Sequence, residues 1–247
     1  MFPTDSFAWL AAVEEGHFWF EQRNQLIVDL MRRFVPRPDR FLEAGCGTGF
    51  VLSRVLDEFP ETRITGLEYF EEAIPFARKR CPGAQIERAN LLDLSFDQQF
   101  DAIGCFDVLE HIPDDVLALR NLSRALTVGG RLFVSVPQHR WLWSAEDDSA
   151  CHQRRYTRKE LQQKAALGGL NCLWHTSFVC SLSPLMLLRK MRGKTNTETA
   201  GQATFEFRLP VAVNWIFGRL LVAERYAINK GVHMPFGGSL FMVFGKT

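Results

Sequence analysis

The spacing of hydrophobic residues changes its period along the chain. Residues 5–35 place apolar side chains near helical spacing, which predicts a helix that ends at Pro36 and Pro38. Farther on, short apolar runs that are typical of buried strands alternate with helical segments. The expected strands are 40–44, 63–67, 85–89, 101–106, 131–136, 171–179 and 239–245, and the expected helices are 50–59, 71–80, 114–126, 157–167 and 211–228.

Strands that alternate with helices predict an α/β fold, with a mostly parallel sheet and helices on both of its faces. Gly129 and Gly130 are expected just past the end of the helix at 114–126, and Thr157 is expected to cap the helix that follows it. In sheets of this kind, ligands bind beyond the carboxyl ends of the strands. Candidate chemistry is therefore sought in the loops that follow the strands.

The overall composition excludes several classes of protein. Of 247 residues, 23% are charged and 47% are hydrophobic, as in an ordinary globular protein rather than a disordered or collagen-like chain. The 29 Lys and Arg against 28 Asp and Glu give a net charge of +1, which argues against a nucleic-acid binder. The 21 Phe against 3 Tyr make the aromatic content apolar, as a pocket for an apolar ligand would need.

Cysteine usage and the N-terminal segment predict a cytoplasmic protein. None of the six cysteines forms a C-x-x-C pair, and no basic segment followed by an apolar run opens the chain. The most apolar stretch, 178–188, is shorter than the roughly 20 residues of a spanning helix. The helix at 211–228 has three possible roles: peripheral contact with a membrane, the face of a homodimer, or core packing. Core packing is the preferred interpretation. A monomer or a homodimer is expected.

The sequence FLEAGCGTG at 41–49 carries the most information about a ligand. A strand enters a turn of small residues, and a helix begins at the far end of this turn with free N–H groups. A dinucleotide fingerprint would need Gly or Ala at position 50, where Phe50 stands, and it gains nothing from an acid before the loop. Glu43 instead favours a nucleoside with a cationic side chain, such as an ammonium or a sulfonium.

Residues 41–49 resemble the E/D-x-G-x-G-x-G motif of the class I S-adenosylmethionine-dependent methyltransferases. Three further features extend the resemblance through about residues 40–180. A strand ends in Glu68, the sequence RANLLD follows the third strand at 88–93, and FDAIGCFDVLEHIP occupies 100–113. The last of these is most similar to the type-11/12 group, which includes the ubiquinone-biosynthesis O-methyltransferases.

The resemblance implies a Rossmann-like sheet of seven strands, mostly parallel with an antiparallel last strand, and S-adenosylmethionine as the cofactor. It divides the chain into four parts: an N-terminal helical cap at 1–38, a cofactor-binding methyltransferase core at 39–180, an inserted helical cap or docking segment at 181–238, and a last core strand at 239–247.

The resemblance also implies a set of cofactor-binding residues. In the family, the acid after the second strand accepts hydrogen bonds from the ribose hydroxyls, which Glu68 can do, and Tyr69 would then lie near the adenine. After the third strand, either Asn90 or Asp93 would contact the adenine amino group, with Leu91 beside Asn90. The whole set is Glu43, Gly45, Cys46, Gly47, Gly49, Glu68, Tyr69, Asn90, Leu91, Phe106 and, for the methionine carboxylate, Arg23.

Methyl transfer needs alignment and a dry site, and an oxygen or nitrogen acceptor also benefits from a base. His111 follows the fourth strand and His152 follows the fifth, and both are candidate bases because a neutral imidazole acts near pH 7. The alternative is that His111 and Glu110 only brace their loop. Arg23 also has a second interpretation, a solvated side chain on a helix that packs against the core.

The spacing D-x-x-E-H at 107–111 resembles an arrangement that holds a divalent cation in some members of the family. Asp107, Glu110 and His111 would give three ligands, with His139 or His152 as a fourth, a mixed set that suits Mg, Mn or Zn. Many methyltransferases carry similar residues without a metal, so the sequence assigns none and leaves this alternative open.

The segment after the fifth strand predicts the acceptor side of the site. The sequences WLWSAEDD at 141–148 and HQRRY at 152–156 resemble a signature of a bacterial subgroup linked to cell-surface glycan or lipid pathways. Arginines there would suit an acidic or phosphorylated acceptor through forked hydrogen bonds. The alternative is a lid braced by pairs between Asp147 and an arginine. The predicted acceptor-binding residues are Trp143, Asp147, Arg154, Arg155 and Tyr156.

We therefore expect an S-adenosylmethionine-dependent methyltransferase that acts on a small-molecule or lipid- or sugar-linked acceptor, at oxygen. The alternatives are a C- or N-methyltransferase and a non-catalytic module that only binds S-adenosylmethionine. Phe50 and Glu43 disfavour an NAD-linked oxidoreductase.

Overall fold

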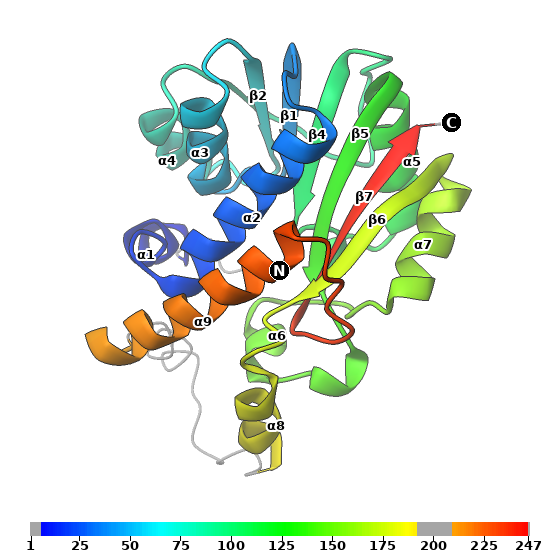
Figure 1. Cartoon of the computed structure of the whole chain (residues 1–247). Helices are drawn as coiled ribbons and strands as arrows, with labels where there is room; N and C mark the ends of the chain where they lie inside the picture. Colours follow the sequence, from blue (N-terminus) through cyan, green and yellow to red (C-terminus); the bar gives the residue numbers. More distant parts are fainter. Residues whose placement is uncertain (1–5, 192–208, 247) are drawn as a thin grey trace.

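A seven-stranded sheet forms the centre of the molecule in the computed structural model, which describes residues 6–191 and 209–246 (Figure 1). Its strands are β1 Arg40–Ala44, β2 Arg63–Glu68, β3 Gln85–Arg88, β4 Phe100–Phe106, β5 Leu126–Pro137, β6 Leu170–Phe178 and β7 Ser239–Lys246. They lie in the order β3-β2-β1-β4-β5-β7-β6. The pairs from β3 to β5 are parallel, and β7 is antiparallel to both β5 and β6. The predicted sheet is confirmed.

Helices cover both faces of the sheet and bury two clusters of apolar side chains. Neighbours in a strand point to opposite faces, so Phe41 of β1 enters one cluster and Leu42 enters the other. The first face carries α2 Phe18–Phe34, α3 Phe50–Glu58, α4 Ile74–Arg80 and α9 Val211–Asn229, and the second carries α5 Asp115–Ala125 and α7 Arg158–Leu167.

The order of the strands reverses beside β1, and this reversal places the functional end of the sheet. β1 pairs with β2 on one side and with β4 on the other, so the loops that leave their carboxyl ends diverge. A crevice therefore opens between the loop at 45–49 after β1, the loop that begins at Tyr69 after β2, and Asp107 after β4.

The single helix expected over 5–35 is wrong. The structure has two helices, α1 Ser6–Val13 and α2, with a break between them. Gly16 takes a left-handed φ of +76°, which ends the helical path, and the Nδ1 of His17 accepts a hydrogen bond from the N–H of Trp19 at 3.3 Å. This cap starts α2 in a new direction. Helix α1 therefore does not continue the axis of α2.

The fifth strand begins earlier than predicted, because Leu126 already pairs with Phe100 of β4. Gly129 and Gly130 therefore lie within β5 and not in a loop, and the register with β4 shifts across this stretch. The expected capping of α7 is confirmed, since the Thr157 hydroxyl accepts the N–H of Glu160 at 3.2 Å. Two short helices were not predicted, α6 Ala145–Ser149 and α8 Ser183–Met191. Part of the insertion predicted at 181–238, residues 192–208, lies outside the described residues.

Core packing explains only one side of the helix expected at 211–228. α9 lies along α2 (Figure 1). Leu221 of α9 is fully buried, and Arg225 Nη1 lies 2.6 Å from Asp29 Oδ2 of α2. The other side exposes a row of apolar residues, Val211, Trp215, Ile216, Leu220 and Tyr226. Within residues 6–191 and 209–246, every helix is too short or too polar to span a membrane.

Candidate active site

A cavity of about 670 Å³ lies at the carboxyl ends of β1, β2 and β4. This volume is within the range of about 300–1,000 Å³ that is usual for small-molecule sites. The glycine loop at 45–49 forms its floor, α2 contributes Trp19, Phe20 and Arg23, and α1 covers one side. Most of the predicted cofactor residues line it: Glu43, Gly45, Cys46, Gly47, Glu68, Tyr69, Asn90, Leu91, Phe106 and Arg23.

The glycines of the loop serve different purposes. Gly47 has a φ of +53°, and a Cβ placed on it would meet no atom within 4 Å, so a side chain there would project into open space beside the cavity. Gly49 does not line the cavity. It has a φ of +80°, and a Cβ on it would lie 3.0 Å from the Cα of Ala77 in α4. The structure thus gives Gly49 a role in packing the start of α3 against α4.

Two buried carboxylates follow the strands at the floor of the cavity. Glu68 accepts the N–H groups of Gly47, Tyr69 and Phe70 at 2.8 to 2.9 Å, which fixes its orientation. Glu43 is 2% exposed, and its Oε2 has no hydrogen-bond partner among the described residues. Burial raises the pKa of Glu43 well above its usual value. An unpaired carboxylate beside a cavity fits a ligand that brings a positive charge.

Arg23 is not a solvated side chain, because only 7% of it is exposed. Its Nη2 lies 2.5 Å from Asp107 Oδ2, and its guanidinium lies 5.3 Å from the ring of Trp19 and 5.8 Å from that of Phe106. The ion pair joins α2 to the end of β4 across the cavity. A role toward the methionine carboxylate stays a prediction, and Arg23 would have to share its charge with Asp107.

The far end of the cavity, after β2 and β3, has an exposed aromatic ring and a small amide. Tyr69 is 53% exposed, and the Oδ1 of Asn90 accepts the N–H of Leu92 at 3.0 Å. This bond uses one lone pair of the Asn90 carbonyl and leaves the second lone pair and the NH2 group for a ligand. Leu91 and Asn90 line the cavity, and Asp93 does not. Of the two candidates, the structure therefore places Asn90 at the site.

His111 lines the other end of the cavity, in the short 3-10 turn η1 Leu109–His111. Burial and, to a smaller extent, the neighbouring His152 lower the pKa of His111 to about 4. The imidazole is therefore neutral at pH 7. His152 stands behind it, with ring centroids 4.8 Å apart, and the Nδ1 of His152 lies 2.8 Å from Asp147 Oδ1. His152 is not among the residues that line the cavity.

The predicted acceptor-binding residues are not part of the cavity lining, and their polar groups pair with other residues of the protein. Arg155 makes a forked pair with Asp147, with its Nε and Nη2 each 2.8 Å from a carboxylate oxygen. The Nη1 of Arg154 lies 2.7 Å from Asp115, and the hydroxyl of the fully buried Tyr156 donates to the same carboxylate at 2.6 Å. Trp143 donates to Asp148 at 2.9 Å. This arrangement supports a braced lid over direct contact with an acceptor.

Several residues that line the cavity, from α1 and the segment after it, were not among the predicted site residues. Phe7, Leu10 and Glu14 line the cavity, and Thr48 of the glycine loop does so too. Nothing in the local pattern near residue 14 distinguishes this acid from a surface acid, because its partners are far away in the sequence. Asp115 was missed for the same reason.

The sheet order, with β7 between β5 and β6, and the cavity floored by a glycine loop and strand-end acids define a Rossmann-like methyltransferase fold. Residues 42–132 match the sequence model of the family described as "Methyltransferase domain". These residues are similar in sequence to the class I S-adenosylmethionine-dependent methyltransferases, including the type-11/12 group.

Individual proteins show the same similarity. The chain is 30% identical over 120 residues to the trans-aconitate 2-methyltransferase of Methylobacterium nodulans, which covers 48% of this chain and 46% of that protein. It is 32% identical over 102 residues to the ubiquinone biosynthesis O-methyltransferase of Idiomarina loihiensis, covering 39% and 41%. The chain spans about half the length of the curated relatives that it matches.

A solved structure shares the fold. Phosphoethanolamine N-methyltransferase 2 of Haemonchus contortus, in complex with S-adenosyl-L-methionine, superposes with a TM-score of 0.60 at 17% identity. The match covers 90% of this chain and 52% of that chain. At this identity the likeness concerns the fold alone.

Proposed function

We propose that this chain transfers the methyl group of S-adenosylmethionine to an oxygen of a small-molecule or lipid- or sugar-linked acceptor. The observation that carries the proposal is a single cavity that joins the acidic floor at Glu43 and Glu68 to His111. One end suits a cationic nucleoside, and the other offers a neutral imidazole. The names of two relatives, a trans-aconitate 2-methyltransferase and a ubiquinone biosynthesis O-methyltransferase, are consistent with a small acceptor.

The residues of the floor bind and orient the cofactor in this proposal. Bound S-adenosylmethionine supplies an electrophilic methyl group on a sulfonium centre. Glu43 offers its unpaired oxygen to the positive charge of the ligand, and Glu68 is held so that its remaining lone pairs face ribose hydroxyls. Trp19, Phe20 and Phe106 line the same space and exclude water, which favours a displacement between aligned groups.

His111 orients the acceptor and takes its proton. A neutral imidazole accepts a hydrogen bond from a hydroxyl at the Nδ1 or Nε2 atom that lacks a proton. With a pKa of about 4, His111 is a weak base. It is therefore matched to a hydroxyl that is already acidic, such as a phenol or an enol, rather than to an aliphatic alcohol. Asp147 orients His152 behind it through the 2.8 Å contact with Nδ1.

A second candidate adds a divalent cation, and a specific observation favours it. Glu110 is fully buried, and neither of its carboxylate oxygens has a hydrogen-bond partner in the described part of the chain. Ligand atoms of Glu110, His111 and His152 all lie within 4.8 Å of one another. Carboxylate and imidazole suit Mg, Mn or Zn, so these residues fit such an ion. Of the other residues in the predicted set, Asp107 pairs with Arg23, and His139 is not in this group.

A bound cation would act as a Lewis acid that polarises the acceptor oxygen. The residues that would hold it are Glu110, His111 and His152, with Asp147 fixing the ring of His152. Without a cation, burial raises the pKa of Glu110 well above its usual value, and the nearby Asp107 raises it further. Burial thus favours the neutral form of this carboxyl group when no cation is bound.

Methyl-transfer assays with phenolic, enolic and alcoholic acceptors test the proposal. We expect activity toward acidic hydroxyls, a loss of roughly 10²–10⁴-fold in kcat for His111→Asn, and little change for the exposed Lys79→Ala. Transfer to carbon or nitrogen only would contradict the assignment of oxygen. Binding of cofactor without transfer to any acceptor would favour a non-catalytic module. Activity that survives exhaustive chelation would show that the reaction does not need a divalent cation.

We also propose that the outer face of α9 contacts an anionic lipid surface. Trp215 is 66% exposed, and the same face carries Arg219. Glu224, the acid of this helix, is turned inward, where it accepts the N–H groups of Cys180 and Ser181 at 2.9 and 2.8 Å. An apolar face with an aromatic residue and a positive charge is typical of interfacial helices. Such contact would bring the site close to a lipid-linked acceptor.

A further inference from the structure

Helix α1 lies across the cofactor cavity and is fastened near both of its ends. Near its start, the ring centroid of Phe7 lies 5.8 Å from that of Phe70, which follows β2. Just past its end, Glu14 is 5% exposed and accepts a hydrogen bond from the Thr48 hydroxyl, which lies 2.6 and 2.7 Å from its two oxygens. Phe7, Leu10 and Glu14 all line the cavity. Helix α1 is therefore one wall of the cofactor site.

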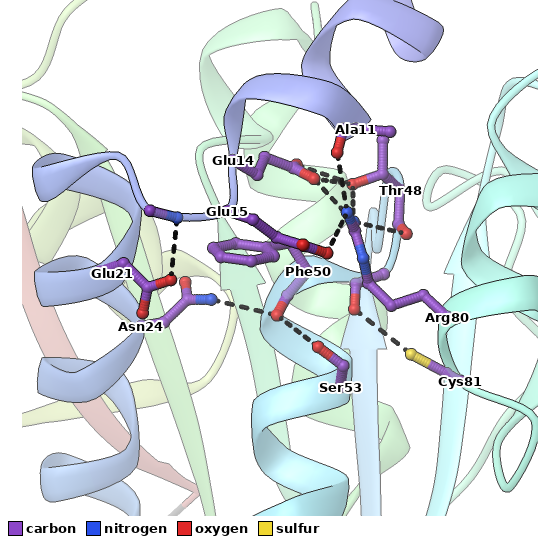
Figure 2. A network of polar contacts seen from close by, with 12 residues as sticks. Ala11, Glu14, Glu15, Glu21, Asn24, Thr48, Phe50, Ser53, Arg80 and Cys81 are labelled. Atoms are coloured by element: carbon purple, nitrogen blue, oxygen red, sulfur yellow. Dashed lines mark hydrogen bonds and ion pairs between the residues drawn. The ribbon is translucent and has the colours of Figure 1, made fainter.

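Arg80, the last residue of α4, holds the second attachment together (Figure 2). Its Nη1 lies 2.6 Å from Glu14 Oε2, and it also donates to the carbonyl of Thr48 at 3.1 Å and to the Thr48 hydroxyl at 2.8 Å. Its Nη2 donates to the carbonyl of Ala11, in the last turn of α1, at 3.1 Å. One guanidinium thus joins α1, the glycine loop and α4.

Phe50, the residue that argues against a dinucleotide, supports this contact. The guanidinium carbon of Arg80 lies 5.2 Å from the centroid of the Phe50 ring, within cation–π distance. The carbonyl of Phe50 accepts the side-chain amide of Asn24 at 3.1 Å, which ties the start of α3 to α2 (Figure 2). A glycine or alanine at position 50 would remove this ring from under Arg80.

We propose that Arg80 and Glu14 are positioning residues for the cofactor. They hold α1 closed over the cavity and fix the part of the glycine loop that contains Thr48. Charge-assisted hydrogen bonds are stronger than neutral ones, and this contact is largely shielded from solvent, with side-chain exposures of 15% for Arg80 and 6% for Glu14. Release of cofactor past α1 requires this contact to break. The inference rests on S-adenosylmethionine as cofactor and not on the acceptor.

Cofactor release from variants of α4 tests the proposal. Lys79→Ala is the matched control, because Lys79 precedes Arg80 on the same helix and is exposed. We expect Arg80→Ala to release S-adenosylhomocysteine roughly tenfold faster in stopped-flow measurements and to bind it more weakly by calorimetry. Arg80→Lys keeps the charge without the fork, so its effect should be intermediate. Amide exchange of residues 6–13 in the bound protein should rise in Arg80→Ala and not in Lys79→Ala.

Glu14→Gln removes the charge from the other side of the contact. This variant tests the proposal if Arg80→Ala does not fold. It should also speed release, and adding it to Arg80→Ala should change little, because both act through the same contact. Release at the wild-type rate from a folded Arg80→Ala or Glu14→Gln protein overturns the proposal, and so do fully additive effects. If the wild-type chain binds no S-adenosylhomocysteine, the proposed cofactor site itself is wrong. This result is distinguishable from unchanged release rates and from additive effects in the variants.

Discussion

Gly47 and Gly49 lie two positions apart in the glycine loop, yet alanine at each is expected to fail for a different reason. Gly47 has a φ of +53°, and a Cβ on it meets nothing within 4 Å. Gly47→Ala should therefore lose only about 1 kcal/mol of unfolding free energy, from the left-handed backbone. The new methyl group extends into the space that the cofactor needs, so we expect cofactor affinity to fall roughly tenfold or more.

Gly49→Ala should give the opposite result, a large loss of stability with little change in cofactor affinity. Its φ is +80°, and the added Cβ would lie 3.0 Å from the Cα of Ala77 and 3.1 Å from the Sγ of Cys81. Backbone strain of about 1 kcal/mol and overpacking of about 1–3 kcal/mol together predict a loss of roughly 2–4 kcal/mol in unfolding free energy. The folded fraction should bind the cofactor within a few-fold of wild type, because Gly49 does not line the cavity.

Urea unfolding measures the stability of both variants, and calorimetry with S-adenosylhomocysteine measures affinity at a temperature where both are folded. Wild-type affinity in Gly47→Ala would refute the placement of the cofactor against this loop. Lost affinity at unchanged stability in Gly49→Ala would show that this residue contacts the cofactor directly.

Three more predictions concern residues around the site. Burial raises the pKa of Asp115, but hydrogen bonds from Lys164 and two neighbours outweigh it and hold the pKa below its usual value. Asp115→Asn should therefore lose roughly 3 kcal/mol of unfolding free energy at pH 7, and urea unfolding should show this gap narrowing as the pH falls below about 4. Arg155→Lys keeps the charge but loses the fork to Asp147, so it should lower the free energy of unfolding, and a raised acceptor KM at unchanged stability would indicate direct contact with the acceptor instead. Wild-type protein should co-sediment with phosphatidylglycerol vesicles, and the Trp215→Ser variant should not. If neither protein binds the vesicles, the proposed contact of α9 with an anionic lipid surface is wrong.

Most of the strands were predictable because they are short apolar runs between turn residues, whereas β3, with the sequence QIER, gave a weaker signal. The error at 5–35 arose because Gly16 interrupts a pattern that is apolar on both sides of it, and a glycine inside a helix is tolerated. The error at Gly129 and Gly130 has another cause. Pairing with β4 extends β5 back to Leu126, and such pairing depends on a neighbour that the local sequence does not show.

On the acceptor side of the site, residue types predicted the chemistry of the side chains but not their partners. Arg154 and Arg155 have the chemistry to bind an anion, and the sequence left open whether they face a ligand or the protein. The fold turns Arg154 toward Asp115 and Arg155 toward Asp147, so their charges are already paired. Asp115 is 39 positions from Arg154 in the chain, and the hydrogen bond from Tyr156 to it spans 41 positions.

The sequence by itself determined the class of fold, the glycine loop and the strand-end acids, because each is encoded in contiguous residues whose spacing is fixed by backbone geometry. The tertiary structure decided which charged groups meet. Glu14, Thr48 and Arg80 are separated by 34 and 32 positions, and they become one contact only when α1, the glycine loop and α4 are packed together (Figure 2). An ion pair needs atoms within a few ångströms, and that distance is a property of the folded chain.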